Sequence, residues 1–447
     1  MRRAESLRAV GLLAGSALVA HGITAAVLPV LTRLYSPGDF SALAVFAGLA
    51  SVLSAVAALR YDIAVPLPED DRDALNLLVL SIALAAASAT VIAALVSWQS
   101  AWIADALSQP HLRPYLWLLP VAVFTTAAYS SLQSWFIRRR RFAVLARNRL
   151  AQSSLSVSTQ AGLGYLSFAP IGLLAGYVVN TGAACVGLGQ RLLCEDGAVI
   201  RQSVRLSAMQ RQFRLYQRFP RYSTLEAVCN NGSVHLPIVL VAAYSAGPEA
   251  GYLALSMSLM QAPMSLVGAA IGQVYLSRAA DEHRRGRLAA TTVETLSYLV
   301  RTGVGPLLAA GVAAPFVFEL IFGEGWQRAG VLVAWMTPWF VLPFLAVPVG
   351  MALHVTGQQQ RALLLQFSGL VIRVAAVVAA GHGASGYVGE AYALSGMVFY
   401  AIYLLVVLAA TGVAPEDARS ALLHGLYHIG AWLVLGTMVA LAGVALQ

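Results

Sequence analysis

Two arginines, Arg301 and Arg373, lie inside stretches that are otherwise apolar and long enough to cross a lipid bilayer. An ionisable side chain in hydrocarbon is costly, so such a residue is by default a candidate for function. The planar guanidinium stays charged and donates parallel hydrogen bonds, which suits phosphate and carboxylate groups. We therefore expect both arginines to face a polar cavity and to bind an anionic ligand. The alternative for Arg301, which lies only a few residues into its stretch, is snorkelling to the membrane surface.

Three other titratable residues in apolar stretches are candidates for binding a coupling ion: His21, Glu226 and Glu390. Histidine exchanges protons near neutral pH, and a carboxylate can bind a proton or a sodium ion. These residues predict a site for H+ or Na+, and we expect no other cofactor. The alternatives are a packing role for His21 and partial solvation for the two glutamates.

Further polar residues lie at or near the ends of apolar stretches and are weaker candidates for contact with a ligand. Arg60 is followed by Asp62, so a local salt bridge is the simpler interpretation. Arg33 is placed to anchor the chain to lipid headgroups, and Asn231 can either line a polar path or bridge two helices. We keep Arg33, Arg60 and Asn231 as candidate binding residues beside the two intramembrane arginines.

The elements that must position these residues are thirteen apolar stretches, each near the roughly 20 residues that a spanning helix needs. Hydrophobic residues make up 59% of the 447 residues and charged residues only 11%, so we expect an all-α polytopic membrane protein. The predicted spans are 9–31, 41–59, 74–97, 115–137, 147–169, 171–193, 222–246, 251–277, 295–321, 328–355, 361–381, 387–411 and 422–446.

Arginines fall mainly in alternate loops, which predicts the orientation of the chain. If the N-terminus is cytoplasmic, most loop arginines lie on the cytoplasmic side, and only Arg33, Arg113 and Arg328 lie on the other. We therefore expect a multi-pass membrane protein with its N-terminus in the cytoplasm. The net charge of +9 is explained by this topology, because a chain this apolar does not fit the nucleic-acid-binding class.

An internal repeat is expected, with two halves of six spans in the same orientation. The segment 34–39 joins the first two spans, and the similar segment 243–249 joins the seventh and eighth. The predicted domains are a first lobe at 1–193, a basic cytoplasmic linker at 194–221, a second lobe at 222–411 and an additional C-terminal transmembrane helix at 412–447. Within the linker, 201–221 is either a solvated connection or a basic amphipathic helix on anionic headgroups.

Several of these segments resemble bacterial polysaccharide flippases of the O-antigen type, in the multidrug, oligosaccharidyl-lipid and polysaccharide exporter superfamily. The resemblance is carried by residues 28–40, by 59–64 with the proline and acidic cluster 66–71, and by 219–223, Asn231 and 251–255. It covers nearly the whole chain. The thirteenth span departs from a plain twelve-helix pattern.

The resemblance implies two six-helix lobes in a V shape around a central cavity. It also implies alternating access that moves an undecaprenyl-diphosphate-linked oligosaccharide from the inner to the outer leaflet. Such a protein serves the synthesis of O-antigen, capsule or exopolysaccharide. Its expected partners are the lipid-linked oligosaccharide, the lipid bilayer and the polysaccharide polymerase machinery.

Other classes of protein fit the residues less well. A drug or other small-molecule exporter of the same superfamily shares the expected fold and differs in its cargo. A membrane glycosyltransferase or polymerase needs a sizeable outward loop with catalytic residues. The longest predicted outer loop, about 98–114, has only Asp105, His111 and Arg113 as ionisable residues. We therefore expect a transporter and not an enzyme.

Overall fold

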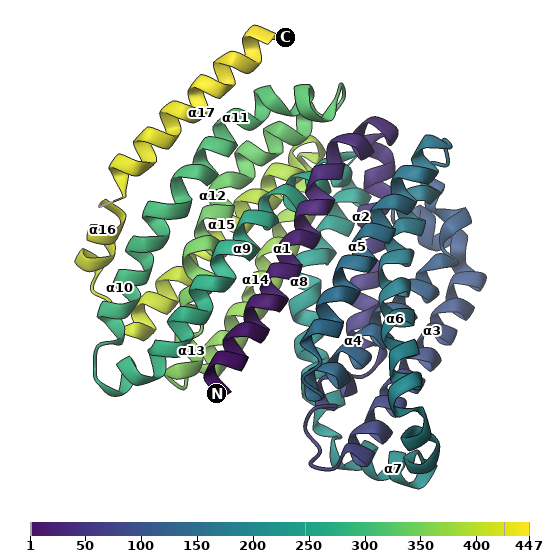
Figure 1. Ribbon diagram of the computed structural model, residues 1–447. Coiled ribbons are helices and arrows are strands. Elements are labelled where there is room, and N and C mark those ends of the chain that lie inside the picture. Colours follow the sequence, from purple (N-terminus) through teal and green to yellow (C-terminus); the bar gives the residue numbers. More distant parts are fainter. Residues whose placement is uncertain (1, 246, 424, 447) are drawn as a thin grey trace. The chain divides into compact units, whose positions relative to one another are not determined.

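The structure is a computed structural model that describes the backbone of residues 2–245, 247–423 and 425–446. Within these ranges the side chains of 2–10, 13–14, 222, 262–263, 265–267, 269–270, 273, 276–277, 280, 354, 359 and 446 are not described. The described chain is helical, with short turns between long helices (Figure 1). Contacts divide it into two compact units, Met1–Ala243 and Tyr244–Gln447.

The first unit is a bundle in which α5 packs on α1 and α6, and α4 packs on α2, α3 and α6. Its helices are α1 (Arg2–Leu34), α2 (Pro37–Ala57), α3 (Asp71–Ala106), α4 (Leu118–Arg138), α5 (Phe142–Tyr165), α6 (Ile171–Ser203), α7 (Leu206–Leu215) and α8 (Thr224–Tyr244). Short 3-10 turns η1 (Tyr61–Ala64) and η2 (Pro110–Tyr115) precede α3 and α4, and the π-helical turn η3 (Phe219–Ser223) leads into α8.

The second unit is built around α12, which packs on α9, α11 and α15. Its helices are α9 (Glu249–Arg284), α10 (Leu288–Leu299), α11 (Gly305–Phe322), α12 (Gln327–Gly350), α13 (Ala352–Val355), α14 (Gln359–Gly383), α15 (Val388–Thr411), α16 (Pro415–Leu423) and α17 (Leu426–Leu446). The π-helical turn η4 (Val300–Val304) joins α10 to α11, and the 3-10 turn η5 (Ser385–Tyr387) precedes α15.

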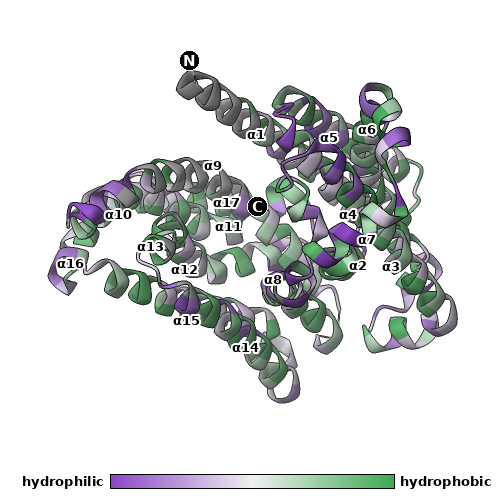
Figure 2. Ribbon diagram, turned by 90° about the horizontal axis from the view of Figure 1, so that it is seen from below, coloured by the Kyte–Doolittle hydropathy of each residue, from purple (hydrophilic) through white to green (hydrophobic). Residues whose placement is uncertain are grey.

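The predicted all-α polytopic fold is confirmed, because each of the thirteen predicted spans coincides with a helix. Among the described residues, ten helices are long and apolar enough to cross a membrane. Helices α4, α5 and α9 are not among these ten. Figure 2 shows hydrophobic residues along several of the helices, with hydrophilic ones on α5, α8 and α10 among others. The predicted lobe boundaries stay a prediction, since a division by contacts does not report an internal repeat.

The turn between α1 and α2 is held by hydrogen bonds of Ser36 and Tyr35. Ser36 caps α2 in a capping box. Its hydroxyl accepts a hydrogen bond from the backbone N–H of Asp39 and donates one to the Asp39 carboxylate. The hydroxyl of Tyr35 donates a 2.7 Å hydrogen bond to the carbonyl of Gln160 on α5. Burial, followed by the charge of Asp39, raises the pKa of Tyr35 to about 12, so the phenol stays neutral and remains a donor.

The basic linker is folded onto the first unit rather than free in solution. The hydroxyl of Tyr61 donates a 2.9 Å hydrogen bond to the carbonyl of Phe213 on α7, and the two rings pack 5.6 Å apart. Arg211 forms a 2.8 Å ion pair with Asp73 at the start of α3. Leu206 and Leu215 remain exposed on α7. Contact of this helix with anionic headgroups stays a prediction.

Candidate functional site

A pocket of about 680 Å³ lies in the second unit, between α9 on one side and α10 with η4 on the other. Its polar residues come from both sides of the turn that joins the two helices: Arg278, Thr291, Glu294, Thr295, Ser297 and Arg301. Apolar and aromatic residues complete the wall: Ile271, Val274, Tyr275 and Tyr298. The pocket therefore combines two cations and one anion with hydroxyl groups and hydrocarbon.

The position of Arg301 follows from a local irregularity of its helix. It lies in η4, where the winding widens to a π-helix for five residues. Pro306 follows closely and has no N–H to donate to the carbonyl of Thr302, so the regular α-helical ladder is interrupted here. The side chain of Arg301 is exposed and lines the pocket. Its predicted contact with a ligand stays a prediction.

Opposite Arg301, helix α9 contributes the residues that sequence reasoning did not select. Arg278 is exposed and lines the same pocket. The hydroxyl of Tyr275, which lines the pocket, is 2.9 Å from that of Thr292, and both side chains are buried, which links α9 to α10. The signal for Arg278 was weak, because an arginine near the end of a span is ordinarily counted toward topology.

Arg373, the other arginine predicted to bind a ligand, is buried on α14 with 3% of its surface exposed. Its guanidinium carbon lies 4.7 Å from the ring centre of Phe399, 5.4 Å from that of Tyr400 and 5.8 Å from that of Trp339. Three aromatic rings from α12 and α15 thus surround the cation, an arrangement that stabilises charge where water is excluded. Its predicted contact with a ligand stays a prediction.

Glu390, predicted to bind a coupling ion, is held in an ion-pair triad. Arg328 at the start of α12 approaches Glu390 on α15 at 2.6 Å and Glu249 on α9 at 2.7 Å. The side chains of Glu390 and Glu249 are only 8% and 15% exposed. Their negative charges are therefore stabilised by pairing with Arg328. Sequence reasoning singled out Glu390 without its partners, because Arg328 is 62 residues from Glu390 and 79 residues from Glu249 along the chain.

The remaining candidates lie in the first unit. Arg60 approaches Asp62 at 3.9 Å, and Asp62 also accepts a 2.7 Å hydrogen bond from Ser130, so the simpler interpretation of a local pair is what the structure contains. Asn231 is half-buried and donates to the carbonyl of Ala227 in its own helix.

Three more candidates in that unit are exposed: Arg33, His21 and Glu226. Arg33 lines a small pocket of about 250 Å³ together with Pro29 and Tyr165. The predicted roles of these three side chains in binding a ligand or an ion stay predictions.

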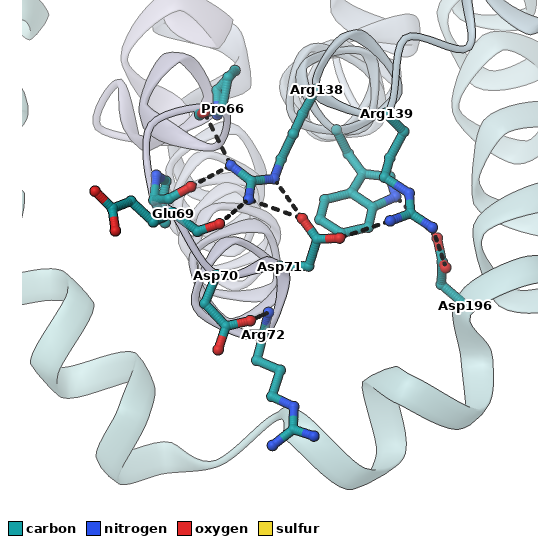
Figure 3. A network of polar contacts seen from close by, with 10 residues as sticks. Pro66, Glu69, Asp70, Asp71, Arg72, Arg138, Arg139 and Asp196 are labelled. Carbon is teal, nitrogen blue, oxygen red and sulfur yellow. Dashed lines mark hydrogen bonds and ion pairs between the residues drawn. The ribbon is translucent and has the colours of Figure 1, made fainter.

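Residues of the proline and acidic cluster have a structural role, shown in Figure 3. The guanidinium of Arg138, at the end of α4, donates to the carboxylate of Asp71 and to the backbone carbonyls of Pro66, Pro68 and Glu69. This arginine fixes the turn that begins α3.

Its neighbour Arg139 extends the same network to α6. It binds Asp71 at 2.7 Å and Asp196 at 3.6 Å, and the indole of Trp135 also donates to Asp196. The network thereby joins α3, α4 and α6 at one end of the first unit. Arg138 and Arg139 therefore bind carboxylates of the fold itself.

The arrangement of helices is that of known transporters. The lipid II flippase MurJ, in an inward closed conformation, superimposes with a TM-score of 0.73 over 97% of this chain and 97% of that chain, at 11% identity. An inward-facing multidrug resistance MATE family transporter of the MOP superfamily gives 0.56 over 90% and 95%, at 15% identity. The eukaryotic MATE transporter AtDTX14 gives 0.55 over 93% and 98%, at 14% identity. The fold is therefore that of a multi-pass transporter or flippase.

The sequence itself identifies the family. Residues 30–330 match the family of polysaccharide biosynthesis proteins, and the chain belongs to this family. A comparison with curated proteins finds no match. The predicted resemblance to polysaccharide flippases of this superfamily is confirmed by the family match and the shared fold.

Proposed function

We propose that this protein is a flippase for undecaprenyl-diphosphate-linked oligosaccharide in the synthesis of a surface polysaccharide. It moves this cargo from the cytoplasmic to the outer leaflet of the bacterial inner membrane by alternating access. The observation that carries the proposal is the pocket that contains Arg278 and Arg301 in a chain of the polysaccharide biosynthesis family. The name of the similar lipid II flippase supports a lipid-linked cargo.

The lining of the pocket matches the chemical parts of such a cargo. The guanidinium groups of Arg278 and Arg301 suit a diphosphate, because each donates parallel hydrogen bonds and stays charged. Glu294 and the hydroxyls of the pocket wall suit sugar hydroxyl groups, and Tyr298 offers an aromatic face. Val274, with 55% of its surface exposed, offers an apolar edge for the first isoprene units.

Orientation, partners and energy source belong to the same proposal. The arginine asymmetry of the loops supports a cytoplasmic N-terminus. Coupling to H+ or Na+ through His21 or Glu226 is proposed ahead of Glu390, because Glu390 is already ion-paired with Arg328. The polysaccharide polymerase machinery is the proposed partner that receives the flipped cargo. We propose a transporter and not an enzyme.

The test is flipping of a labelled undecaprenyl-diphosphate oligosaccharide in proteoliposomes. We compare the native protein with Arg301→Ala, Arg278→Ala and the control Arg361→Ala, an exposed arginine at the start of α14 outside the pocket. We expect the two pocket variants to lose flipping by about tenfold or more, as for removal of charge-assisted bonds to phosphate. The control should flip at the native rate.

Two results would contradict the proposal in different ways. Native rates in both pocket variants would remove the pocket from the mechanism while keeping the cargo. No flipping by a folded native protein, with and without proton and sodium gradients, would exclude this cargo. In that case a drug exporter becomes the better assignment, in line with the similar multidrug resistance MATE family transporter.

A further inference from the structure

The π-helical turn η4, which carries Arg301, is held by close contacts with neighbouring helices on two sides. A Cβ atom added to Gly303 would collide with the ring of Phe344 on α12. One added to Gly305 would lie 2.5 Å from Cδ1 of Trp432 on α17. Two aromatic rings therefore lie directly on the backbone of the segment from 303 to 305, and only glycine leaves room for them.

The C-terminal helix meets both ends of this turn. Gly425, just before α17, lies against the side chain of Val300 so closely that a Cβ there would collide with it. Trp432, two helical turns further along the chain, covers Gly305. Contacts from Gly425 and from Trp432 of α17 thus flank the five residues of η4.

C-terminal to Trp432, α17 runs along α11 (Figure 1). Small residues of α17 lie at this contact. A Cβ at Gly436 would lie 2.8 Å from the backbone of Ala309, and one at Gly443 would lie 3.2 Å from the carbonyl of Phe316. Glycines on one face of a membrane helix permit close backbone approach and strong dispersion contact. The amphipathic α16, which precedes α17, packs on α10, the other helix that lines the pocket.

A π-helical turn is less favourable than regular α-helix and persists where its surroundings select it, often at functional sites. Regular winding of 300–304 would rotate Arg301 relative to α9 and therefore relative to Arg278. The contacts of Val300 with Gly425 and of Gly305 with Trp432 act on residues on either side of Arg301 in the chain.

We propose that α17, chiefly through Trp432 and together with the preceding Gly425, is a positioning element that sets the direction of Arg301 into the pocket. This assigns a role to the thirteenth span, which a plain twelve-helix transporter lacks. The inference rests on the proposed binding of a lipid diphosphate in the pocket. Trp432 itself does not line the pocket, so it acts through Arg301 and not by contact with the ligand.

The test is a double-mutant cycle on equilibrium binding of undecaprenyl diphosphate to the purified full chain in nanodiscs. The variants are Trp432→Ala, Arg301→Ala and the double variant, with Trp335→Ala as a control because Trp335 is an exposed tryptophan on α12. We expect Trp432→Ala to weaken binding about tenfold, as a small misplacement of a binding group does. In the Arg301→Ala background the same change should have no further effect, since residues that act through one group do not add.

A second pair of variants distinguishes loss of positioning from loss of folding. Gly305→Leu drives a side chain into Trp432 and should weaken binding, and Trp432→Ala added to it should restore part of the affinity by restoring space. Equal effects of Trp432→Ala with and without Arg301, or an equal effect of Trp335→Ala, would overturn the positioning role. Absence of binding by the native protein would instead contradict the proposed function, so the two failures are distinguishable.

Discussion

The guanidinium carbon of Arg373 lies 4.7 Å from the centre of the Phe399 ring, and the arginine is 3% exposed. Tyr400 and Trp339 complete the aromatic surroundings at 5.4 Å and 5.8 Å. A charge this deep in a helical unit is tolerated because the ring quadrupoles replace part of the lost hydration. The packing of α14 on α12 and α15 therefore depends on a cation and not only on hydrocarbon.

Replacing Arg373 by alanine should destabilise the protein before it affects any ligand. Loss of the cation contacts, worth up to ~2 kcal/mol when desolvated, leaves a gap among three rings. Arg373→Lys should retain part of the stability, because it keeps the charge and loses the planar stacking. The measurement is the thermal midpoint in detergent, with Arg361→Ala on the same helix as control. An unchanged midpoint in Arg373→Ala, together with lost flipping, would favour direct contact with the ligand.

Removing Arg328 should cost more stability than removing either of its two glutamate partners. Arg328→Gln leaves Glu249 and Glu390 without their cation, whereas Glu249→Gln leaves one complete ion pair. We expect a loss of about 2 kcal/mol for Arg328→Gln, limited by its partial exposure. Thermal unfolding in detergent checks the order, with the exposed Arg113→Gln as control. A larger loss in Glu249→Gln would show that the triad does not hold α9, α12 and α15 together.

Tyr61→Phe should release the basic linker from the first unit. The change removes the 2.9 Å hydrogen bond to Phe213, worth about 1 kcal/mol, and keeps the ring contact. Trypsin should then cut the arginine-rich segment 201–221 several-fold faster, measured by gel against time. Tyr165→Phe, at an exposed tyrosine, should leave the rate unchanged. Equal cutting of Tyr61→Phe and native protein would mean that other contacts hold α7.

The hydrogen bond from Tyr61 to the carbonyl of Phe213 should be lost at alkaline pH. Burial raises the pKa of Tyr61 above its ordinary value of 10.0, so the folded state binds the phenol proton more tightly than the unfolded state does. The contribution to stability is therefore constant below pH 10.0 and is lost as pH rises through the folded-state pKa. The difference in stability between native protein and Tyr61→Phe should shrink over that range. A difference that grows with pH would reverse the assigned direction.

Gly172→Ala should disrupt the contact of α6 with the turn between α1 and α2. A Cβ at this position collides with the hydroxyl of Tyr35, which would have to leave its hydrogen bond to Gln160. We expect a loss of about 1–3 kcal/mol in thermal or denaturant unfolding. Gly162→Ala is the matched control, since no described heavy atom outside its own helix lies within 4 Å of its Cβ. It should be neutral or slightly stabilising.

Features that depend on neighbours in the chain were accessible from the sequence. Spans are recognisable because every backbone group in lipid must be paired within a helix, which demands long apolar runs. The capping box of Ser36 and Asp39 and the approach of Arg60 to Asp62 are likewise local. These short-range rules need no knowledge of which helices pack together.

Features that join distant helices were not accessible in this way. Arg278 became a binding candidate only when α9 and η4 were found to line one pocket. Arg328 was assigned to loop topology, while its partner Glu249 was one polar residue in a repeated turn. Neither residue has a local signal for an ion pair, because the contact forms between helices far apart in sequence.

The sequence by itself determined an all-helical membrane protein, the positions of its spans and the presence of arginines in costly surroundings. The tertiary structure decided what each arginine does. Arg373 is enclosed by aromatic rings, Arg138 and Arg328 neutralise carboxylates, and Arg301 and Arg278 face a pocket. Hydropathy is a property of each segment alone, whereas the partner of a charge depends on which helix faces it.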